Sequence, residues 1–140
     1  MNNKGYTLVE VLAVIAILSI LSGVAVAGVS RYLVKSRQQA YDSMASSAYD
    51  AAASYILKEG IPSDGKVSFS ELISSGYLKE VVDPKTKEKS CSCSDFDNCN
   101  SYVEIQKLSV SDTNALDDYK YIVHIRCSSG YSKDYNMKEW

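Results

Sequence analysis

Proline and histidine are scarce in this chain. The first shortage argues against a helix break early in the chain, and the second against catalysis by histidine. Of its 140 residues, only Pro62 and Pro84 are prolines, so no proline interrupts a helix before position 62. His124 is the only histidine, and it lies in a strand pattern without an obvious nucleophile beside it. There is also no glycine-rich loop of the kind that holds phosphates. These features predict a protein that is not an enzyme.

A strong charge of either sign is also missing. The net charge is -2 and the isoelectric point is near 5.4. Proteins that bind nucleic acid usually carry a basic patch or a basic excess. We therefore expect no nucleic-acid partner, and no motif in the chain predicts a cofactor.

The longest stretch without charge runs from Val11 to Ser30. As a helix it would cover about 30 Å at about 1.5 Å per residue, which is the thickness of the hydrocarbon layer of a bilayer. This stretch is predicted to span a membrane. In an ordinary secretory signal the small residue at the cleavage site follows the apolar core, but here Gly5 precedes it, so cleavage would leave the helix on the mature protein.

Glu10 is a carboxylate at the edge of this apolar stretch. An unpaired carboxylate in hydrocarbon costs at least about 2 kcal/mol, so it needs a cationic partner. A free amino group on Tyr6 would be the nearest one. We expect a better-buried pair if Glu10 of one subunit meets the Tyr6 amine of a neighbour in a bundle of helices.

The run Lys4-Gly5-Tyr6-Thr7-Leu8-Val9-Glu10, followed by an apolar helix, resembles the prepilin N-terminus. This N-terminus is found in type IV pilins and in the pseudopilins of type II secretion and competence systems. The resemblance implies that Gly5 ends a leader cut by a prepilin peptidase, that Tyr6 becomes N-methylated, and that Glu10 sets the register between subunits. Tyr6 replaces the usual phenylalanine.

The resemblance also implies partners and a location. The partners would be copies of this chain or other pilins, the prepilin peptidase, an assembly platform with its ATPase, and membrane lipid before assembly. The protein would cross the cytoplasmic membrane once with its C-terminal head outside, and would then join a filament on the cell surface. The cations Arg31, Lys35 and Arg37 conflict with this orientation, because positive residues usually stay on the cytoplasmic side.

Beyond Ser30 the helix is expected to continue to about Lys58. Apolar residues recur there at three- and four-residue spacing, and Gly60 with Pro62 supplies a stop. The recurring residues are Tyr41, Met44, Ala48, Ala51 and Tyr55. The predicted divisions of the chain are a leader (1–5), a membrane and assembly helix (6–30), and an extracellular head (31–140) that includes the amphipathic half of the helix.

The remaining sequence predicts an α+β, pilin-like head with a small antiparallel sheet packed on the long helix. Ser68 and Glu71 have capping-box spacing and predict a short helix from about Phe69 to Ser75. Residues 102–110 and 119–127 are predicted to form a hairpin, with a bulge near Gln106-Lys107. The tail after 128 is predicted either to add an edge strand or to cross the surface.

All four cysteines, Cys91, Cys93, Cys99 and Cys127, follow the apolar stretch. For a protein exported across a membrane, disulfides are the favoured interpretation. Cys127 would pair with Cys91 or Cys93, since its pairing with Cys99 would require a strained ring between the first two. Zinc bound by these thiols and calcium bound by nearby oxygens are the alternatives. The calcium candidates are Asp95, Asp97 and Asn98.

Two functions follow from these patterns. The first is a structural subunit, either a major or minor pilin or a pseudopilin, that polymerises through its apolar helix after cleavage. The alternative is a single-span, membrane-anchored extracellular binding domain that never polymerises. The two differ at the N-terminus, which would begin at a methylated Tyr6 in the first case and at Met1 in the second.

Overall fold

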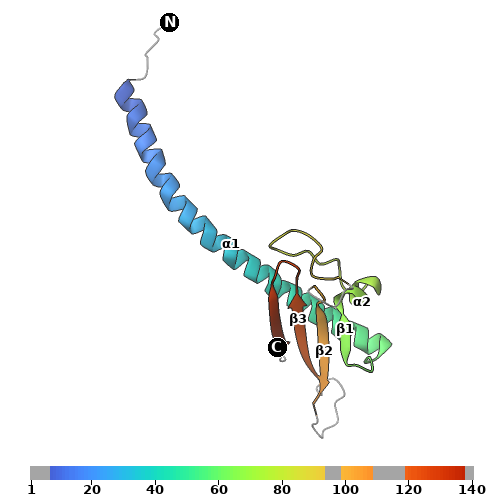
Figure 1. The fold of residues 1–140 in the computed structure, drawn as a ribbon. Coiled ribbons are helices and arrows are strands. Elements are labelled where there is room, and N and C mark those ends of the chain that lie inside the picture. Colours follow the sequence, from blue (N-terminus) through green and yellow to red (C-terminus); the bar gives the residue numbers. More distant parts are fainter. Residues whose placement is uncertain (1–6, 94–98, 109–118, 138–140) are drawn as a thin grey trace. The chain divides into compact units, whose positions relative to one another are not determined.

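A computed structural model describes residues 7–93, 99–108 and 119–137. The protein has an α+β, pilin-like fold with one long helix and a four-stranded antiparallel sheet (Figure 1). The elements in chain order are α1 (Leu8–Glu59), β1 (Lys66–Ser68), α2 (Phe69–Ser74), β2 (Tyr102–Lys107), β3 (Tyr119–Arg126) and β4 (Ser132–Met137). The contacts divide the chain into two units, Met1–Gln38 and Gln39–Trp140, and each is described by itself.

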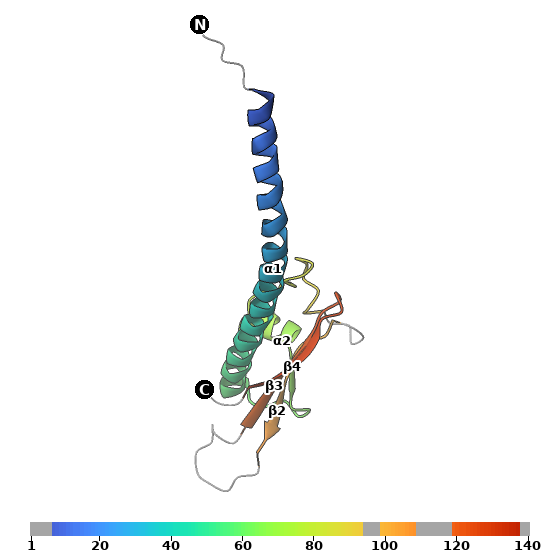
Figure 2. The same ribbon diagram turned by 90° about the vertical axis from the view of Figure 1, so that its left-hand side faces the viewer.

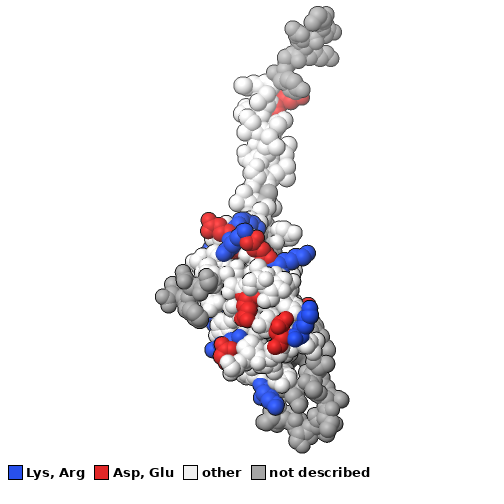
Figure 3. Space-filling model, turned by 90° about the vertical axis from the view of Figure 1, so that its right-hand side faces the viewer, with Lys and Arg blue, Asp and Glu red and all other residues white. Residues whose placement is uncertain are grey.

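The described part of the first unit is the N-terminal portion of α1, and its apolar side chains are exposed. Exposed fractions range from 45% at Val11 to 78% at Leu8, and none of the most apolar 18-residue window is buried. The hydroxyls of Ser19 and Ser22 donate to the carbonyls of Ile15 and Leu18, both at 2.7 Å, so they are satisfied within the helix. Figure 3 shows this stretch of the helix as a white surface, that is, one without charged residues. Such a helix is long and apolar enough to cross a membrane.

The second unit begins within α1 and buries one stripe of that helix against the sheet (Figure 2). Most of the stripe is alanine. The buried residues of α1 are Tyr41, Ala45, Ala48, Ala51 and Ala52. Gly60, with a φ of +88°, ends the helix, and the predicted stop is confirmed.

The sheet has the strand order β1-β2-β3-β4, and every pair is antiparallel. Along β3, Tyr121, Val123 and Ile125 are buried, whereas His124 and Arg126 lie on the other face, and the strand predicted over 119–127 is confirmed. From the other elements, the core receives Val67, Phe69, Leu72, Leu78, Val81, Cys91, Val103, Ile105 and Cys127.

The capped helix is confirmed and the bulge is not. Ser68 caps α2, and its Oγ accepts a hydrogen bond from the Glu71 amide at 3.2 Å. In contrast, β2 pairs with β3 in unbroken register from Tyr102 to Lys107, so the bulge predicted near Gln106 was wrong. Because the strand ends at Lys107, Leu108 need not share the phase of the residues before it; it is 42% exposed.

Two strands complete the sheet around the predicted hairpin. The tail forms the edge strand β4, one of the two arrangements that the sequence had left open. The strand β1 was not predicted, because three residues are too short to show alternation. It pairs with β2 through Val67 and Val103, and the amide of Ile105 donates to the Gly65 carbonyl at 2.8 Å.

Candidate functional site: the N-terminal motif and the polar contacts of the head

Thr7 and Glu10 form the start of α1. The Glu10 amide donates to the Thr7 carbonyl at 3.0 Å and to Thr7 Oγ1 at 3.4 Å, so Thr7 acts as the N-cap. Glu10 is the acidic residue of the first turn, where the helix dipole favours a negative charge. The predicted cleavage residues, Gly5 and Tyr6, lie outside the described residues.

This geometry leaves Glu10 exposed at the start of an exposed apolar helix. In Figure 3, acidic atoms lie at the start of the white stretch of described residues. Within the described residues of this unit, the large apolar side chains after Glu10 are exposed. A carboxylate there has the helix N-terminus as its local electrostatic partner, which stabilises it only modestly.

Comparison with protein families finds the prokaryotic N-terminal methylation motif at residues 1–26. The chain carries the type IV pilin signature. Comparisons with curated proteins and with solved structures found no match. The match covers the N-terminal motif alone, and this motif indicates a pilin-like or pseudopilin precursor that is processed by a prepilin peptidase.

The cysteines of this pilin-like chain form two disulfides, Cys91–Cys127 and Cys93–Cys99. The first is one of the two pairings that the sequence favoured, and it joins the loop before β2 to the end of β3. No free cysteine remains, so the chain offers no thiolate for the zinc alternative. The calcium candidates Asp95, Asp97 and Asn98 lie outside the described residues.

Asp83 is a buried carboxylate beside the first disulfide, and sequence analysis did not select it as a functional residue. Its Oδ1 accepts hydrogen bonds from the Tyr41 hydroxyl at 2.6 Å and from the Lys85 amide at 2.8 Å. The bond to Lys85 is an Asx turn, which the Asp83-Pro84 pair signals in the sequence. Tyr41 lies 42 positions away, and no local pattern predicts that contact.

Burial and hydrogen bonding have opposite effects on this carboxyl group. Burial raises the pKa of Asp83. The hydrogen bonds that it accepts, including those from Tyr41 and the Lys85 amide, lower this pKa by more, so the net pKa lies below its usual value. Burial and the Asp83 charge together raise the pKa of Tyr41 to about 12. The pair is therefore an ionised carboxylate with a neutral phenol donor, which joins α1 to the loop after α2.

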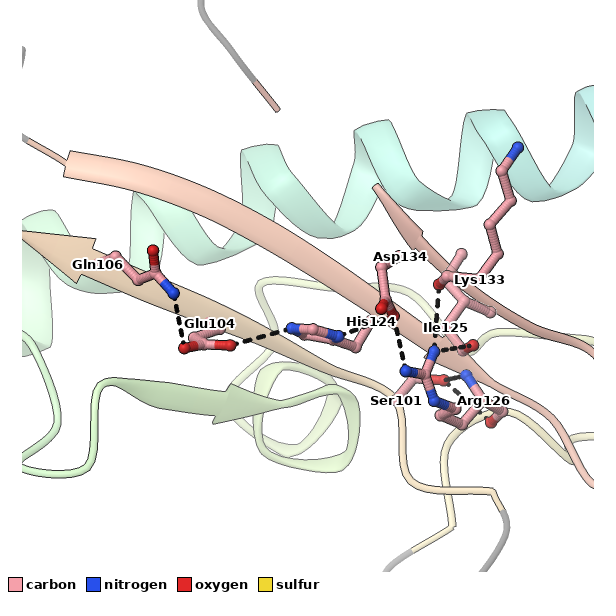
Figure 4. Close-up of polar contacts among 8 residues, drawn as sticks. All are labelled: Ser101, Glu104, Gln106, His124, Ile125, Arg126, Lys133 and Asp134. Carbon is pink, nitrogen blue, oxygen red and sulfur yellow. Dashed lines mark hydrogen bonds and ion pairs between the residues drawn. The ribbon is translucent and has the colours of Figure 1, made fainter. Parts of the chain in front are cut away.

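His124 lies at the centre of a polar cluster on the face of the sheet that does not meet α1 (Figure 4). Its Nδ1 is 2.8 Å from Asp134 Oδ1 on β4, and its Nε2 is 3.1 Å from Glu104 Oε2 on β2. Arg126 Nη2 is 2.6 Å from the same Asp134 oxygen. Gln106 donates to Glu104 at 3.0 Å. These contacts connect three neighbouring strands.

The neighbours of the two carboxylates in this cluster lower the pKa of both. The hydrogen bond from Gln106 lowers the pKa of Glu104, burial raises it, and His124 lowers it again, so that the net pKa is below its usual value. Burial raises the pKa of Asp134, whereas Arg126 and His124 lower it by more. Both ring nitrogens of His124 already have carboxylate neighbours, which favours a structural role over catalysis.

Proposed function

We propose that this chain is a structural subunit of a type IV pilus-like filament, either a major or minor pilin or a pseudopilin. The observation that carries the proposal is the methylation motif at residues 1–26, followed directly by a helix whose apolar side chains are exposed. In a monomer outside the membrane, that surface would remain in water at a large free-energy cost. Lipid covers it before assembly, and neighbouring subunits cover it afterwards.

The proposed pathway begins at the N-terminus. A prepilin peptidase cuts after Gly5 and methylates the new amino group of Tyr6. An assembly platform and its ATPase then move the subunit from the cytoplasmic membrane, head outside, into the filament. There Glu10 meets the Tyr6 amine of a neighbour, and a pair buried among apolar helices is strong enough to set the register.

Mass spectrometry of the N-terminus tests the proposal. We expect the full-length chain, produced with a prepilin peptidase, to begin at Tyr6 and to carry one added methyl group. Gly5→Leu should block cleavage. Gly28→Leu is the matched control, because Gly28 has open space where a Cβ would stand, and it should leave cleavage unchanged.

The contrary outcome is equally clear. If the wild-type chain keeps Met1 in the presence of an active peptidase, the anchored, non-polymerising binding domain becomes the better description. If the chain is processed but never joins filaments in cells that assemble them, the filament role is wrong.

A further inference from the structure

Three cations follow the apolar part of α1, and no ion pair joins them to an acid in the described residues. Arg31, Lys35 and Arg37, which we name the basic collar, are all exposed. Within the described part of the chain, the acids that form ion pairs do so with other residues: Glu80 with Lys89, Asp42 with Lys133, and the acids around His124. Among the described residues the collar therefore has no acidic partner, and its exposed charges are open to a partner from outside the chain.

We propose that the basic collar binds the phosphate groups of anionic lipids at the membrane surface while the subunit awaits assembly. The inference rests on the proposed function, because it requires α1 to span the membrane. It identifies a lipid contact surface that the methylation motif, which matches residues 1–26, does not include.

The spacing along α1 supports this placement. From Glu10 to Arg31 the helix advances about 30 Å at about 1.5 Å per residue, which equals the hydrocarbon thickness of a bilayer. With Glu10 at one interface, the collar therefore lies at the headgroups of the other. Tyr32, which is 71% exposed, falls within the collar, and tyrosine is enriched at this depth.

The distribution around the helix favours a lipid surface over a single acidic side chain. Arg31 and Lys35 are one turn apart and share a face, whereas Arg37 points about 120° away from Arg31 at about 100° per residue. One carboxylate on a neighbour could not reach all three residues. Headgroups surround a spanning helix on every side, and guanidinium groups bind phosphate oxygens in pairs.

The proposal also explains why basic residues follow the span although the head is expected outside the cell. Basic residues after a span oppose export of the segment that follows them. On an anionic surface, however, each basic residue contributes about a fivefold preference for that surface. The collar would hold the subunit at a defined depth until the assembly machinery extracts it.

Lipid selectivity of the full-length protein in bilayers tests the collar. We would reconstitute the chain in phosphatidylcholine membranes and measure by electron paramagnetic resonance how strongly it associates with spin-labelled phosphatidylglycerol relative to spin-labelled phosphatidylcholine. We expect the wild type to prefer phosphatidylglycerol by about fivefold or more at low salt, and by less at high salt. In the R31Q/K35Q/R37Q variant the ratio should fall close to one.

The matched control removes three exposed lysines from the second unit, as K58Q/K79Q/K107Q. It changes the net charge equally and should keep the wild-type selectivity. A wild type without preference for phosphatidylglycerol, or a collar variant that keeps the preference, would overturn the proposal. So would a collar variant that fails only in filament incorporation while the wild type shows no lipid selectivity, since that result assigns the collar to a protein neighbour.

N-terminal processing, measured on the same samples, separates this proposal from the proposed function. Lipid selectivity that depends on the collar in a chain that is never cleaved would support the collar and count against the filament subunit. A cleaved, filament-forming chain without lipid selectivity would support the filament subunit and count against the collar.

Discussion

At the scale of single residues, the hydrogen bond from Tyr41 to Asp83 matters for stability because it satisfies a buried carboxylate. Asp83 has no exposed surface, and Tyr41 is 4% exposed. A buried carboxylate is stable only while its hydrogen bonds are kept, because removal of one donor leaves a desolvated charge. The Tyr41 ring also stacks on Tyr131, with 3.5 Å between the ring centroids, so the hydroxyl is held in place.

Replacing Tyr41 with phenylalanine should therefore destabilise the head. We expect a loss of about 1–3 kcal/mol in the free energy of unfolding, since the ring is kept and only the donor to Asp83 is lost. Tyr55→Phe is the control: its hydroxyl donates to the exposed Glu71 at 2.8 Å, and its loss should change stability by less than about 0.5 kcal/mol. Denaturant unfolding followed by near-ultraviolet circular dichroism measures both. Equal effects would show that burial of Asp83 does not matter.

The lowered pKa of Asp83 predicts how stability depends on pH. Its stabilising contribution is complete well above the unfolded pKa of about 3.9, and is lost as the pH falls through the lower pKa of the folded state. Asp83→Asn should be less stable than wild type at pH 7, and its melting temperature should change less between pH 5 and pH 3.

The control for this titration is Asp50→Asn, because Asp50 is exposed on α1. Its melting temperature should follow the wild-type profile at every pH. If Asp83→Asn retains the full acid sensitivity of the wild type, the acid transition belongs to other groups, and Glu104 and Asp134 on the outer face of the sheet, whose pKa values are also lowered, are the next to test.

At the scale of elements, the loop between α2 and β2 depends on its covalent and polar attachments. The described parts of residues 75–101 contain no helix or named strand, and their connections to the rest of the head include the Cys91–Cys127 disulfide, the contacts of Asp83, backbone and side-chain hydrogen bonds of Ser90 and Ser101, and a few core residues such as Leu78 and Val81. A segment with so few backbone ladders relies on such attachments for its order.

The two disulfides should differ in what they contribute. Cys91–Cys127 closes a separation of 36 residues, and Cys93–Cys99 closes one of 6. The loss of chain entropy in the unfolded state predicts about 4 kcal/mol for the first and about 2 kcal/mol for the second. The Cys91→Ala/Cys127→Ala variant should therefore melt at a lower temperature than Cys93→Ala/Cys99→Ala, as measured by differential scanning fluorimetry.

Burial strengthens that ranking. Cys91 and Cys127 are 0% and 2% exposed, so their replacement also leaves an internal cavity, whereas Cys93 and Cys99 are only partly buried. If the two double variants had the same melting temperature, the Cys91–Cys127 disulfide would not be the main attachment of this loop.

At the scale of the whole molecule, the proposed filament depends on the charge at Glu10. Glu10→Ala should leave expression and N-terminal cleavage intact and lower incorporation into filaments by at least about tenfold, because one missing buried pair costs more than about 1.4 kcal/mol. Glu59→Ala, at the exposed end of the same helix, is the matched control. Quantitative immunoblots of sheared filaments against total cell protein measure the ratio.

Two results of this experiment would have different meanings. Normal filaments from Glu10→Ala would contradict the register role of Glu10 and leave the subunit role intact. An equal loss with Glu59→Ala would show that the assay responds to any change in α1 and would remove the support for a specific charge pair.

The sequence by itself determined the features that depend on neighbours along the chain. The methylation motif, the uncharged stretch from Val11 to Ser30, the Ser68 cap and the alternation along β3 all come from local spacing, because helices and strands repeat every few residues. From these patterns the α+β class and the long helix followed, and the order of the described elements agrees with them.

Only the tertiary structure decided which distant groups meet. It selected Cys91 rather than Cys93 as the partner of Cys127, placed Tyr41 against Asp83, and put the carboxylates of β2 and β4 on the two sides of His124. It also removed the expected bulge, since the register of a strand is set by its pairing across the sheet. Such contacts depend on positions in space, and one-dimensional spacing does not contain them.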